Sequence, residues 1–290
     1  MNKIPIILNP AARGDRARAL KEKIEALSIR CVVRLTSNIG DAREMARQAV
    51  IDGFETIVAA GGDGTVNEVA NGLAGSEVNF GILPVGTMNV FASELGIPTG
   101  NLERAWNVIE AGHVRELDLP TANDDHFVQL AGIGLDAEVV RRTTLDSKKA
   151  LGPISYLITL AQVAADQPPK IEIEPIDSAV RTGSFVLVGN GRLYGGPFTL
   201  FQDAKPDDGL LDVLVFKNQS HWDVVRYFQA IAFGSHVELP DVEYFQTRSM
   251  MVRGGEDIPV ELDGELTGTL PCRFGFSDHK LRVLAPPSET

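Results

Sequence analysis

The sequence predicts an α/β protein with two domains: an N-terminal domain with a parallel sheet and a C-terminal domain of antiparallel strands. Up to about residue 115, strand signals alternate with helix signals, which indicates parallel strands joined by right-handed crossovers. After Leu117, short apolar runs follow one another between glycine-rich and proline-rich turns, as in antiparallel sandwiches and barrels. We therefore place the domains at residues 1–117 and 118–279.

The elements follow this division along the chain. In the first domain we expect strands at Ile4–Leu8, Cys31–Leu35, Thr56–Ala60 and Phe80–Leu83, and helices at Asp15–Leu27, at Gly40–Asp52 and from Val66. In the second we expect strands at Phe127–Ala131, Lys170–Ile176, Ser184–Gly189, Leu211–Phe216, Met250–Val252, Ile258–Leu262, Cys272–Phe276 and Leu281–Leu284. Helical segments near Gly152–Ala165 and His221–Ala232 interrupt these strands.

Composition narrows the class of protein. With 44% apolar and 23% charged residues, the chain has the composition of an ordinary globular protein. The two cysteines, Cys31 and Cys272, show no CxxC spacing, which argues for reduced thiols in the cytoplasm and against a zinc site. The N-terminus lacks a signal-peptide pattern, and the apolar stretch Ile154–Ala165 is too short and polar to span a membrane. We expect a soluble cytoplasmic protein.

Net charge limits the partners. A formal charge of −12 argues against a broad basic surface for nucleic acid and against whole-protein adhesion to anionic lipid. Arg141, Arg142, Lys148 and Lys149 form a local basic patch, for which a solvated face is the simpler interpretation. Oligomeric state is not readable from the sequence, and a homodimer stays open.

The strongest motif is TIVAAGGDGTVNEV at residues 56–69, where a buried strand runs through three glycines into a helix. Glycine allows phosphate to approach backbone N–H groups, and a helix N-terminus attracts anions. Asp63 would repel a bare phosphate, but it fits if Mg²⁺ lies between carboxylate and phosphate. The alternative is a glycine-rich turn in which Asp63 or Thr65 caps a helix.

A second loop has similar features. GILPVGTMNVFA at residues 81–92 again ends a strand in proline and glycine, with Thr87 and Asn89 before a helical run. Both loops follow strands of one sheet, so we expect them together at its carboxyl edge, where open α/β sheets bind ligands. Helix capping alone could also explain Thr87 and Asn89.

Other catalytic motifs are absent from the sequence. There is no GxxxxGK[ST] loop, no GxGxxG after the first strand, no HRD or DFG, and no GxSxG or HExxH. These absences argue against P-loop, dinucleotide-binding, protein-kinase, α/β-hydrolase and zinc-peptidase chemistry.

GGDGTVNEV at 61–69, followed by LPVGTMNVFA at 83–92, resembles the catalytic domain of the diacylglycerol kinase family. That family includes soluble bacterial lipid kinases and the sphingosine and ceramide kinases. The resemblance covers nearly the whole chain, through NPAARG at 9–14, Thr36 with GDA at 40–42, FVQLAGIGLDA at 127–137, AKPDDGLLDV at 204–213 and ELDGE at 261–265. One departure is Arg13, which stands where the family usually has glycine.

The resemblance implies an ATP- and Mg²⁺-dependent lipid kinase. Its first domain would be a doubly wound, nucleotide-binding sheet similar to those of NAD kinases and phosphofructokinases, and its second a β-sandwich. The resemblance also implies that a last strand, at about residues 280–286, returns to the first domain. The substrate would be a membrane lipid such as diacylglycerol, reached by reversible peripheral contact with the membrane.

The same resemblance implies roles for individual residues. By motif position, the ATP contacts are Asn9, Pro10, Thr36, Gly61, Gly62, Asp63, Gly64, Thr65, Val66, Asn67 and Thr87. Asp63 would hold the catalytic Mg²⁺, in a water-linked network with Asp118 and Asp263. Glu265 would be the base, and the Lys205 carbonyl, Asp208 and the Leu210 carbonyl would hold a structural Mg²⁺. A hairpin turn is the alternative interpretation of both Asp207-Asp208-Gly209 and Asp263-Gly264.

Three alternatives stay open. Asp263 could be the base instead of Glu265, because the two would share one face of an unbroken strand. An NAD kinase-like phosphotransferase shares the GGDG loop, and a non-catalytic nucleotide-binding regulator could use the same fold.

Apolar residues around Leu151–Leu160 are the expected membrane contact.

Overall fold

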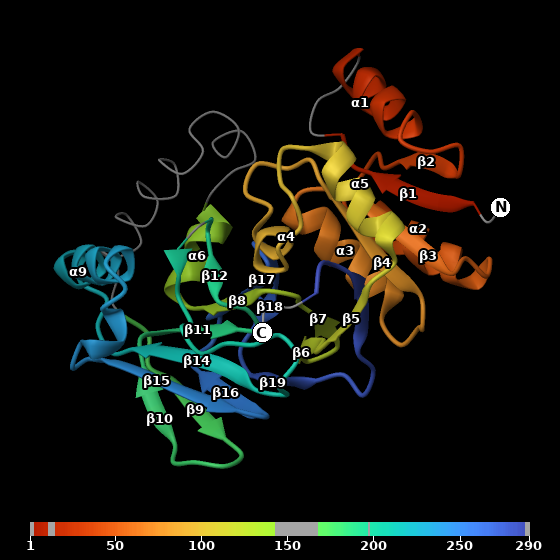
Figure 1. Ribbon diagram of the computed structural model, residues 1–290. Helices are drawn as coiled ribbons and strands as arrows, with labels where there is room; N and C mark the ends of the chain where they lie inside the picture. Colours follow the sequence, from red (N-terminus) through yellow and green to blue (C-terminus); the bar gives the residue numbers. More distant parts are fainter. Residues whose placement is uncertain (1–2, 11–14, 143–167, 197, 288–290) are drawn as a thin grey trace. The chain divides into compact units, whose positions relative to one another are not determined.

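The computed structural model describes residues 3–10, 15–142, 168–196 and 198–287 (Figure 1). The chain divides into two compact units, which are described separately. Unit 1 comprises Met1–Leu119 and Ser277–Thr290, and unit 2 comprises Pro120–Phe276. Unit 2 is therefore inserted in the sequence of unit 1.

Unit 1 is built on a six-stranded sheet. Its strands, in spatial order, are β2 (Cys31–Leu35), β1 (Ile4–Leu8), β3 (Thr56–Gly61), β4 (Asn79–Pro84), β20 (Leu281–Leu284) and β5 (Val114–Leu117). All neighbouring strands pair in parallel except β20 and β5, which are antiparallel. β1 and β3 are nearly or completely buried, as expected for strands covered on both faces.

Helices cover both faces of this sheet. They are α1 (Asp15–Glu25), α2 (Asp41–Ile51), α3 (Asp63–Leu73), α4 (Val90–Glu94) and α5 (Leu102–Ala111). The chain moves outward from β1 to β2 and then back past β1 to β3, so right-handed crossovers place α1 on one face and α2 and α3 on the other. α2 and α3 pack closely, since a Cβ on Gly72 would lie 2.4 Å from the Arg43 carbonyl oxygen.

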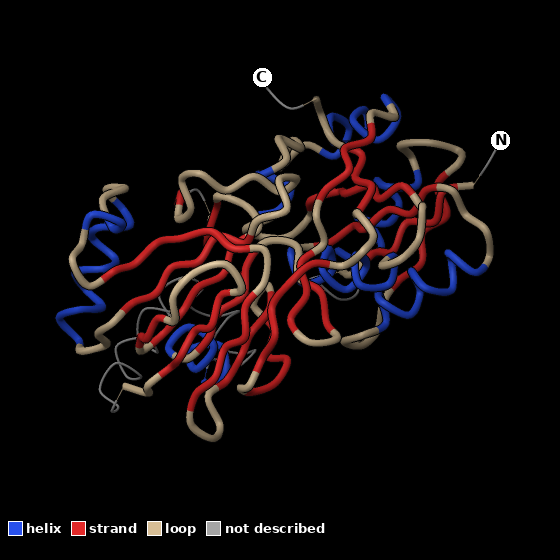
Figure 2. Tube along the Cα trace, turned by 90° about the horizontal axis from the view of Figure 1, so that it is seen from below, coloured by secondary structure: helices blue, strands red, loops and turns tan. Residues whose placement is uncertain are grey.

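Unit 2 contains two six-stranded antiparallel sheets, whose strands are red in Figure 2. The first has the order β10 (Arg181–Gly183), β9 (Ile171–Pro175), β16 (Met250–Gly254), β19 (Cys272–Phe276), β6 (Pro120–Ala122) and β7 (Asp125–His126). The second has the order β15 (Val242–Thr247), β14 (Leu211–Phe216), β11 (Phe185–Gly189), β8 (Leu130–Ile133), β17 (Pro259–Leu262) and β18 (Glu265–Thr269). A small ribbon joins β12 (Leu193–Tyr194) to β13 (Phe198–Thr199).

The second sheet of unit 2 is buried on both faces. Val213 and Val215 of β14 point into a core shared with the first sheet, whereas Leu214 and Phe216 join a separate core. This other core includes apolar residues of α6 (Leu135–Arg142) and α9 (His221–Ala232) and lies near the short helix η1 (His236–Glu238). Unit 2 is therefore a sandwich with a helical layer on one side.

The expected fold class is confirmed in both parts, although individual elements differ. The strand expected at Phe127–Ala131 begins at Leu130, and the helix expected from Val66 begins at Asp63. β5, β15, β18, α5 and α6 were not predicted, and the segment Gly152–Ala165 lies outside the described residues. Among the described helices, none combines the length and apolarity needed to cross a bilayer. Cys31 and Cys272 are free thiols.

Candidate functional site

The carboxyl edge of the unit 1 sheet collects the residues expected to contact ATP. Asn9 follows β1 and donates its backbone N–H to the Ala60 carbonyl at 3.0 Å, and Thr36 follows β2 and donates to Leu8 at 3.0 Å. Pro10 continues the first of these segments. The strand order reverses between β1 and β3, and such a switch point is where doubly wound sheets bind ligands.

The GGDG segment forms the end of a strand and the start of a helix. Gly61 ends β3, Gly62 is the N-cap of α3, and Asp63 is the first helical residue. The remaining predicted contacts, Gly64, Thr65, Val66 and Asn67, follow in the first turns of α3. The first four N–H groups of a helix lack partners within it, so this position favours an anion.

The two glycine-rich segments contact each other. The backbone N–H groups of Val85 and Gly86 donate to the Gly61 carbonyl at 3.0 and 3.2 Å. A Cβ on Gly86 would lie 2.3 Å from the Gly62 Cα, so this approach of two backbones requires glycine. The structure thus brings together the two loops as the sequence predicted.

Asn89 shapes the second loop. Its side chain accepts the Gly86 N–H at 3.0 Å and donates to the Gly86 carbonyl at 2.9 Å, and its own backbone is left-handed with φ 50°. Asn89 is buried, whereas Thr87 between these residues is exposed. Asn89 therefore holds the turn that presents Thr87.

Asp63 links the starts of two helices. Its Oδ1 accepts the Phe91 N–H, in the first turn of α4, at 3.3 Å. Burial raises the pKa of Asp63, although the backbone N–H groups at the start of α4 oppose that effect. A desolvated carboxylate is a suitable partner for a cation.

This donor set fits Mg²⁺ bound together with phosphate. In the described part of the chain, no group of three or more His, Cys, Asp or Glu side chains could hold a metal ion by itself. Mg²⁺ is commonly held by one or two carboxylates plus substrate phosphates and water, so Asp63 beside a helix N-terminus meets that requirement.

Glu68, which the sequence analysis did not single out, links two helices at this edge of the sheet. Its carboxylate accepts the N–H groups of Gly40 and Ala42, both at 3.0 Å, and so joins α3 to the start of α2. Asp41 accepts the N–H groups of Ser37 and Asn38, and these hydrogen bonds lower its pKa. The segment after Thr36 is thereby fixed beside α3. The sequence signal that could have identified Glu68 is its position in the GGDGTVNEV motif, one helical turn after Gly64.

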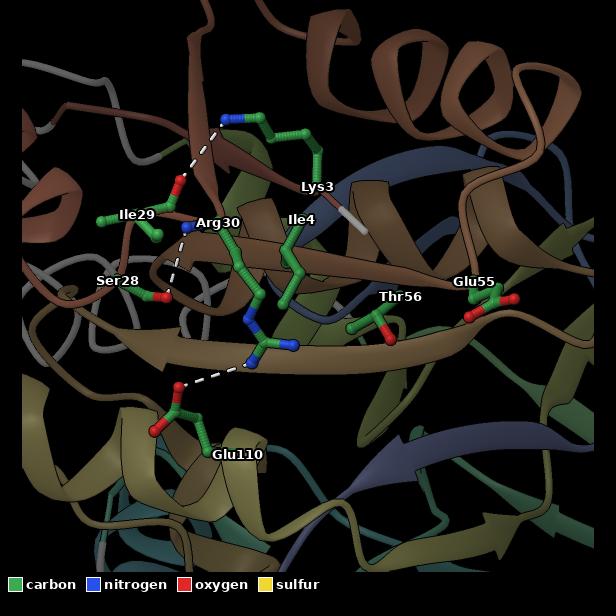
Figure 3. A pocket seen from close by; sticks show the side chains of 8 residues that line it. All are labelled: Lys3, Ile4, Ser28, Ile29, Arg30, Glu55, Thr56 and Glu110. Atoms are coloured by element: carbon green, nitrogen blue, oxygen red, sulfur yellow. Dashed lines mark hydrogen bonds and ion pairs between the residues drawn. The ribbon is translucent and has the colours of Figure 1, made fainter. Parts of the chain in front are cut away.

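Depressions on the described part of unit 1 include one at each of two different edges of the sheet. One of about 440 Å³ adjoins the second loop and is lined by Pro84, Val85, Gly86, Thr87, Met88, Asn89, Thr99, Gly100, Asn101 and Leu102. Figure 3 shows another, of about 500 Å³, lined by Lys3, Ile4, Ser28, Ile29, Arg30, Glu55, Thr56 and Glu110. Ile4 and Thr56 begin β1 and β3, so this second depression lies at the edge opposite the glycine loops, and Arg30 pairs with Glu110 at 3.4 Å within it.

Asp118 does not lie with Asp63. It follows β5, which runs antiparallel to β20 and hence opposite to β3 and β4. The carboxyl end of β5 is therefore at the amino edge of the other strands, about 20 Å from the glycine loops at about 3.3 Å per residue. Asp118 is buried and forms an ion pair with Lys280. This geometry corrects the grouping of Asp118 with Asp63 in one network.

In unit 2, Asp263 and Gly264 form the turn between β17 and β18. Both have positive φ, 49° and 87°, and Leu262 pairs with Glu265 across them, as in a type I′ hairpin. The Asp263 carboxylate accepts the backbone N–H groups of Val128, Gln129 and Leu130 at 2.7, 3.0 and 2.9 Å. The chain reverses between Asp263 and Glu265, so the expectation that they share one face of an unbroken strand is wrong.

Glu265 is exposed at the start of β18, and a buried carboxyl pair lies behind its turn. Glu261 on β17 accepts the Gly264 N–H at 2.6 Å. Asp136 lies close to it, because a Cβ on Gly132 would be 2.6 Å from an oxygen of each. Burial raises the pKa of Glu261 well above 4.5, and the Asp136 carboxylate raises it further. Glu261 therefore binds a proton more readily than an ordinary glutamate.

A narrow apolar pocket adjoins this pair in unit 2. It is lined by Leu135, Asp136, Phe185, Leu187, Tyr194, Phe216, Val224, Tyr227, Phe228 and Ile231. The Tyr194 hydroxyl donates to Asp136 at 2.7 Å, which gives an otherwise apolar lining one polar corner.

The acidic segment expected to hold a structural Mg²⁺ forms a turn before β14. Asp208 Oδ1 accepts the Leu210 N–H at 3.0 Å, and Gly209 has φ 74°. Burial raises the pKa of Asp212 to about 6, and the nearby carboxylates of Asp208 and Asp203 add to this effect. The Lys205 carbonyl belongs to the same segment. Negative charge is thus concentrated where a cation was expected.

Several expectations fall partly or wholly outside the described residues. Arg13, Lys148, Lys149 and the segment Leu151–Leu160 all lie there. Within the basic patch, Arg141 and Arg142 each pair with Glu138 at 2.5 Å. The single Glu138 carboxylate therefore balances one of the two positive charges in the described part of the patch.

Comparisons with known proteins match both units. The family model "Diacylglycerol kinase catalytic domain" matches residues 3–122, and "YegS C-terminal NAD kinase beta sandwich-like domain" matches residues 130–285. A diacylglycerol kinase of Bacillus subtilis (strain 168) is 30% identical over 99% of this chain and 97% of its own. One of Staphylococcus carnosus (strain TM300) is 30% identical over 97% of this chain and 94% of its own. A crystal structure of a diacylglycerol kinase from Bacillus anthracis str. Sterne is 28% identical and has a TM-score of 0.79, with 99% of this chain and 97% of that chain covered.

Proposed function

The chain belongs to the diacylglycerol kinase family and is a kinase, and from that premise we propose that it transfers the γ-phosphate of ATP to a hydroxyl of a membrane lipid such as diacylglycerol. Phosphoryl transfer depends mainly on positioning and charge neutralisation, because the protein has little covalent chemistry to perform. Each unit carries groups suited to one part of this reaction.

The observation that carries the proposal is the contact of the two glycine loops at the switch point of the sheet. Gly62 and Gly86 approach so closely that no side chain fits between them, and the first turn of α3 follows at once. Backbone N–H groups at such a place suit the charged phosphates of ATP. Asn9 and Thr36 follow the neighbouring strands and would contact the nucleotide from there.

Mg²⁺ is proposed at Asp63. The ion would neutralise the charge of the phosphate oxygens during transfer. Asp63 would supply its carboxylate, whose pKa is raised by burial, and the Phe91 N–H would fix the orientation of that carboxylate.

The acceptor lipid is proposed to bind unit 2. A lipid alcohol combines long apolar chains with a hydroxyl, and the pocket between α6, α9 and the second sheet combines an apolar lining with the Asp136–Tyr194 pair. Glu265 is proposed as the base that accepts the proton of the hydroxyl while its oxygen bonds to phosphorus. Asp263 is a poorer candidate, because its carboxylate already accepts three backbone N–H groups.

A second, structural Mg²⁺ is proposed at Asp208, with the Lys205 and Leu210 carbonyls. The support is electrostatic: Asp203, Asp208 and the buried Asp212 interact unfavourably, and a cation would relieve that repulsion. We further propose reversible, peripheral contact with the membrane, which a lipid substrate requires.

The test is transfer of label from γ-labelled ATP, with and without Mg²⁺, to a panel of acceptors. Diacylglycerol, phosphatidylglycerol, a sphingoid base, a polyprenol and NAD separate the alternatives. Label in an extractable lipid supports the proposal. Label in NAD alone would favour an NAD kinase-like enzyme, and ATP binding without any transfer would favour a regulator.

A further inference from the structure

We propose that the outer face of α9 docks the protein on a lipid bilayer, an inference that rests on the proposed lipid substrate. The face carries Trp222 and Val225, and Phe233 continues it at the C-cap of the helix; we call these three residues the α9 stripe. Trp222 is 83% exposed and Phe233 is 85% exposed, and Val225 is 48% exposed. Large side chains so free of protein contact are suited to insertion into a lipid interface.

The stripe is a continuous face of the helix. Its members, with Gln229 between them, are spaced by three, four and four residues, which brings them to one side of an α-helix. The opposite side carries Val224, Tyr227, Phe228 and Ile231, and all four line the apolar pocket. Docking by the stripe would keep the pocket within about one helix diameter, roughly 10 Å, of the lipid interface.

Charge also favours this face. Arg226 is the only Lys or Arg in α9, and it pairs with Asp223 at 3.0 Å and with Asp241 at 2.5 Å. The stripe itself holds no charged side chain. In a chain with formal charge −12, an uncharged apolar stripe can bind lipid by burial of its side chains and does not rely on attraction to anionic head groups. Binding should therefore depend little on salt.

A bilayer fits the stripe better than a second copy of the chain does. A helix of 12 residues is about 18 Å long, so one of its faces covers a few hundred Å². Stable protein interfaces bury about 800 Å² on each partner. Insertion of aromatic side chains into lipid needs no such area, because each buried aromatic contributes independently.

The chain offers a direct spectroscopic test. It has two tryptophans, and Trp106 is only 2% exposed, so a change in fluorescence on adding vesicles reports mainly Trp222. Vesicles of phosphatidylcholine and phosphatidylglycerol in equal parts should shift the emission to the blue, and brominated phosphatidylcholine should quench it. Trp222→Phe should abolish both changes. Wild-type emission that is unaffected by either vesicle would overturn the proposal.

Flotation with the same vesicles tests the stripe without reference to turnover. Trp222→Ser/Phe233→Ser should lower the vesicle partition coefficient by about tenfold per aromatic removed, at low and high salt alike. The matched control is Ile176→Ser/Val180→Ser, which removes exposed apolar side chains of unit 2 outside α9 and should float like wild type. An equal loss of flotation in both double variants, or no loss in the stripe variant, would refute a lipid-docking stripe. A wild-type dimer in sedimentation that the stripe variant no longer forms would refute it as well.

Activity separates this inference from the proposed function. The stripe variant should phosphorylate a short-chain diacylglycerol in solution as wild type does, but should lose activity on long-chain diacylglycerol in vesicles. Stripe-dependent flotation without lipid phosphorylation would contradict the proposed function alone. Lipid phosphorylation with unchanged flotation of the variant would contradict the docking surface alone.

Discussion

Asp63 in unit 1 and Asp263 in unit 2 look alike in sequence but differ in structure. Each lies next to a glycine, and each was expected to hold Mg²⁺. Asp263 accepts three backbone N–H groups at 2.7–3.0 Å and ties a hairpin turn to the start of β8. Asp63 lies at a helix start where burial outweighs its hydrogen bonds and raises its pKa. A carboxylate saturated by the backbone holds the fold, whereas a desolvated one is ready for a cation.

Asp63→Asn should abolish most of the phosphoryl transfer without destabilising the fold. Loss of the charged oxygen should lower kcat by about a thousandfold or more, because a metal ligand stabilises the transition state by several kcal/mol. The melting temperature at pH 7 should not fall, because the substitution removes a carboxylate that burial disfavours in its charged form. A variant with near-normal kcat at saturating Mg²⁺ would contradict the metal role.

Glu265→Gln tests the base on unit 2. We expect kcat to fall by about 10²–10⁴-fold, the usual contribution of general base catalysis. ATP affinity should hardly change, because the base acts on the acceptor. Steady-state kinetics and ATP titration would show this, and the position at the exposed start of β18 makes misfolding a minor concern. An active Glu265→Gln enzyme would return the role of base to Asp263.

Asp263→Asn should show the reverse of Asp63→Asn. Its amide group would face N–H donors that now meet a carboxylate, so we expect unfolding free energy to fall by about 3 kcal/mol. Denaturant titration gives that number. Activity per folded molecule, measured well below the melting temperature, should fall less than in the Asp63 variant. Unchanged stability together with a lost Mg²⁺ response would make Asp263 a metal ligand after all.

Glu261→Gln sharpens the comparison through pH. Burial and the neighbouring carboxylates of Asp136 and Asp263 raise the pKa of Glu261 above 4.5, so the folded protein keeps a proton that the unfolded chain has released. Wild-type stability should therefore fall as pH rises from about 4.5 toward the folded pKa. Glutamine mimics the protonated acid. The variant should therefore have the same melting temperature as wild type at pH 4 and a higher melting temperature than wild type at pH 8. If the two melting temperatures instead differ by the same amount at every pH from 4 to 8, Glu261 is not the group that holds the proton.

Asp208→Ala should have the smallest effect in the absence of metal. It removes the acceptor of the Leu210 N–H, a loss of about 1 kcal/mol. If Mg²⁺ binds there, wild type should gain melting temperature with added Mg²⁺, and the variant should lose most of that gain. Scanning calorimetry of both proteins at increasing Mg²⁺ concentrations, with calcium removed, would measure this gain in melting temperature. Equal Mg²⁺ responses would reduce the segment to a turn.

The sequence predicted most of what depends on local pattern. The alternation of elements in unit 1 and the meeting of the two glycine loops required only strand order and the rule for the carboxyl edge. β18 was not predicted because all five of its residues are exposed, so its sequence shows no apolar periodicity. α5 carried a signal that could have been used, since Asn101 caps its start and Gly112 its end.

The site residues were predictable only where neighbours in sequence are also neighbours in space. The partners of Asp263 lie more than 130 residues earlier in the chain, and no spacing rule connects them. Asp118 was misplaced because a strand of four residues does not reveal its direction in the sheet. The α9 stripe was missed because an amphipathic pattern identifies the buried face but not what covers the other one.

The position of β20 has a consequence for synthesis of the protein. This strand lies between β4 and β5, yet it leaves the ribosome only after the whole of unit 2. A nascent chain that ends before residue 281 has a gap in the first sheet, with the edges of β4 and β5 unpaired. Unpaired edges invite misassociation, so unit 2 should fold first and the nucleotide-binding sheet should close last. Unit 1 therefore cannot complete its sheet before unit 2 has been synthesised, unlike a domain that folds as soon as its own residues have left the ribosome.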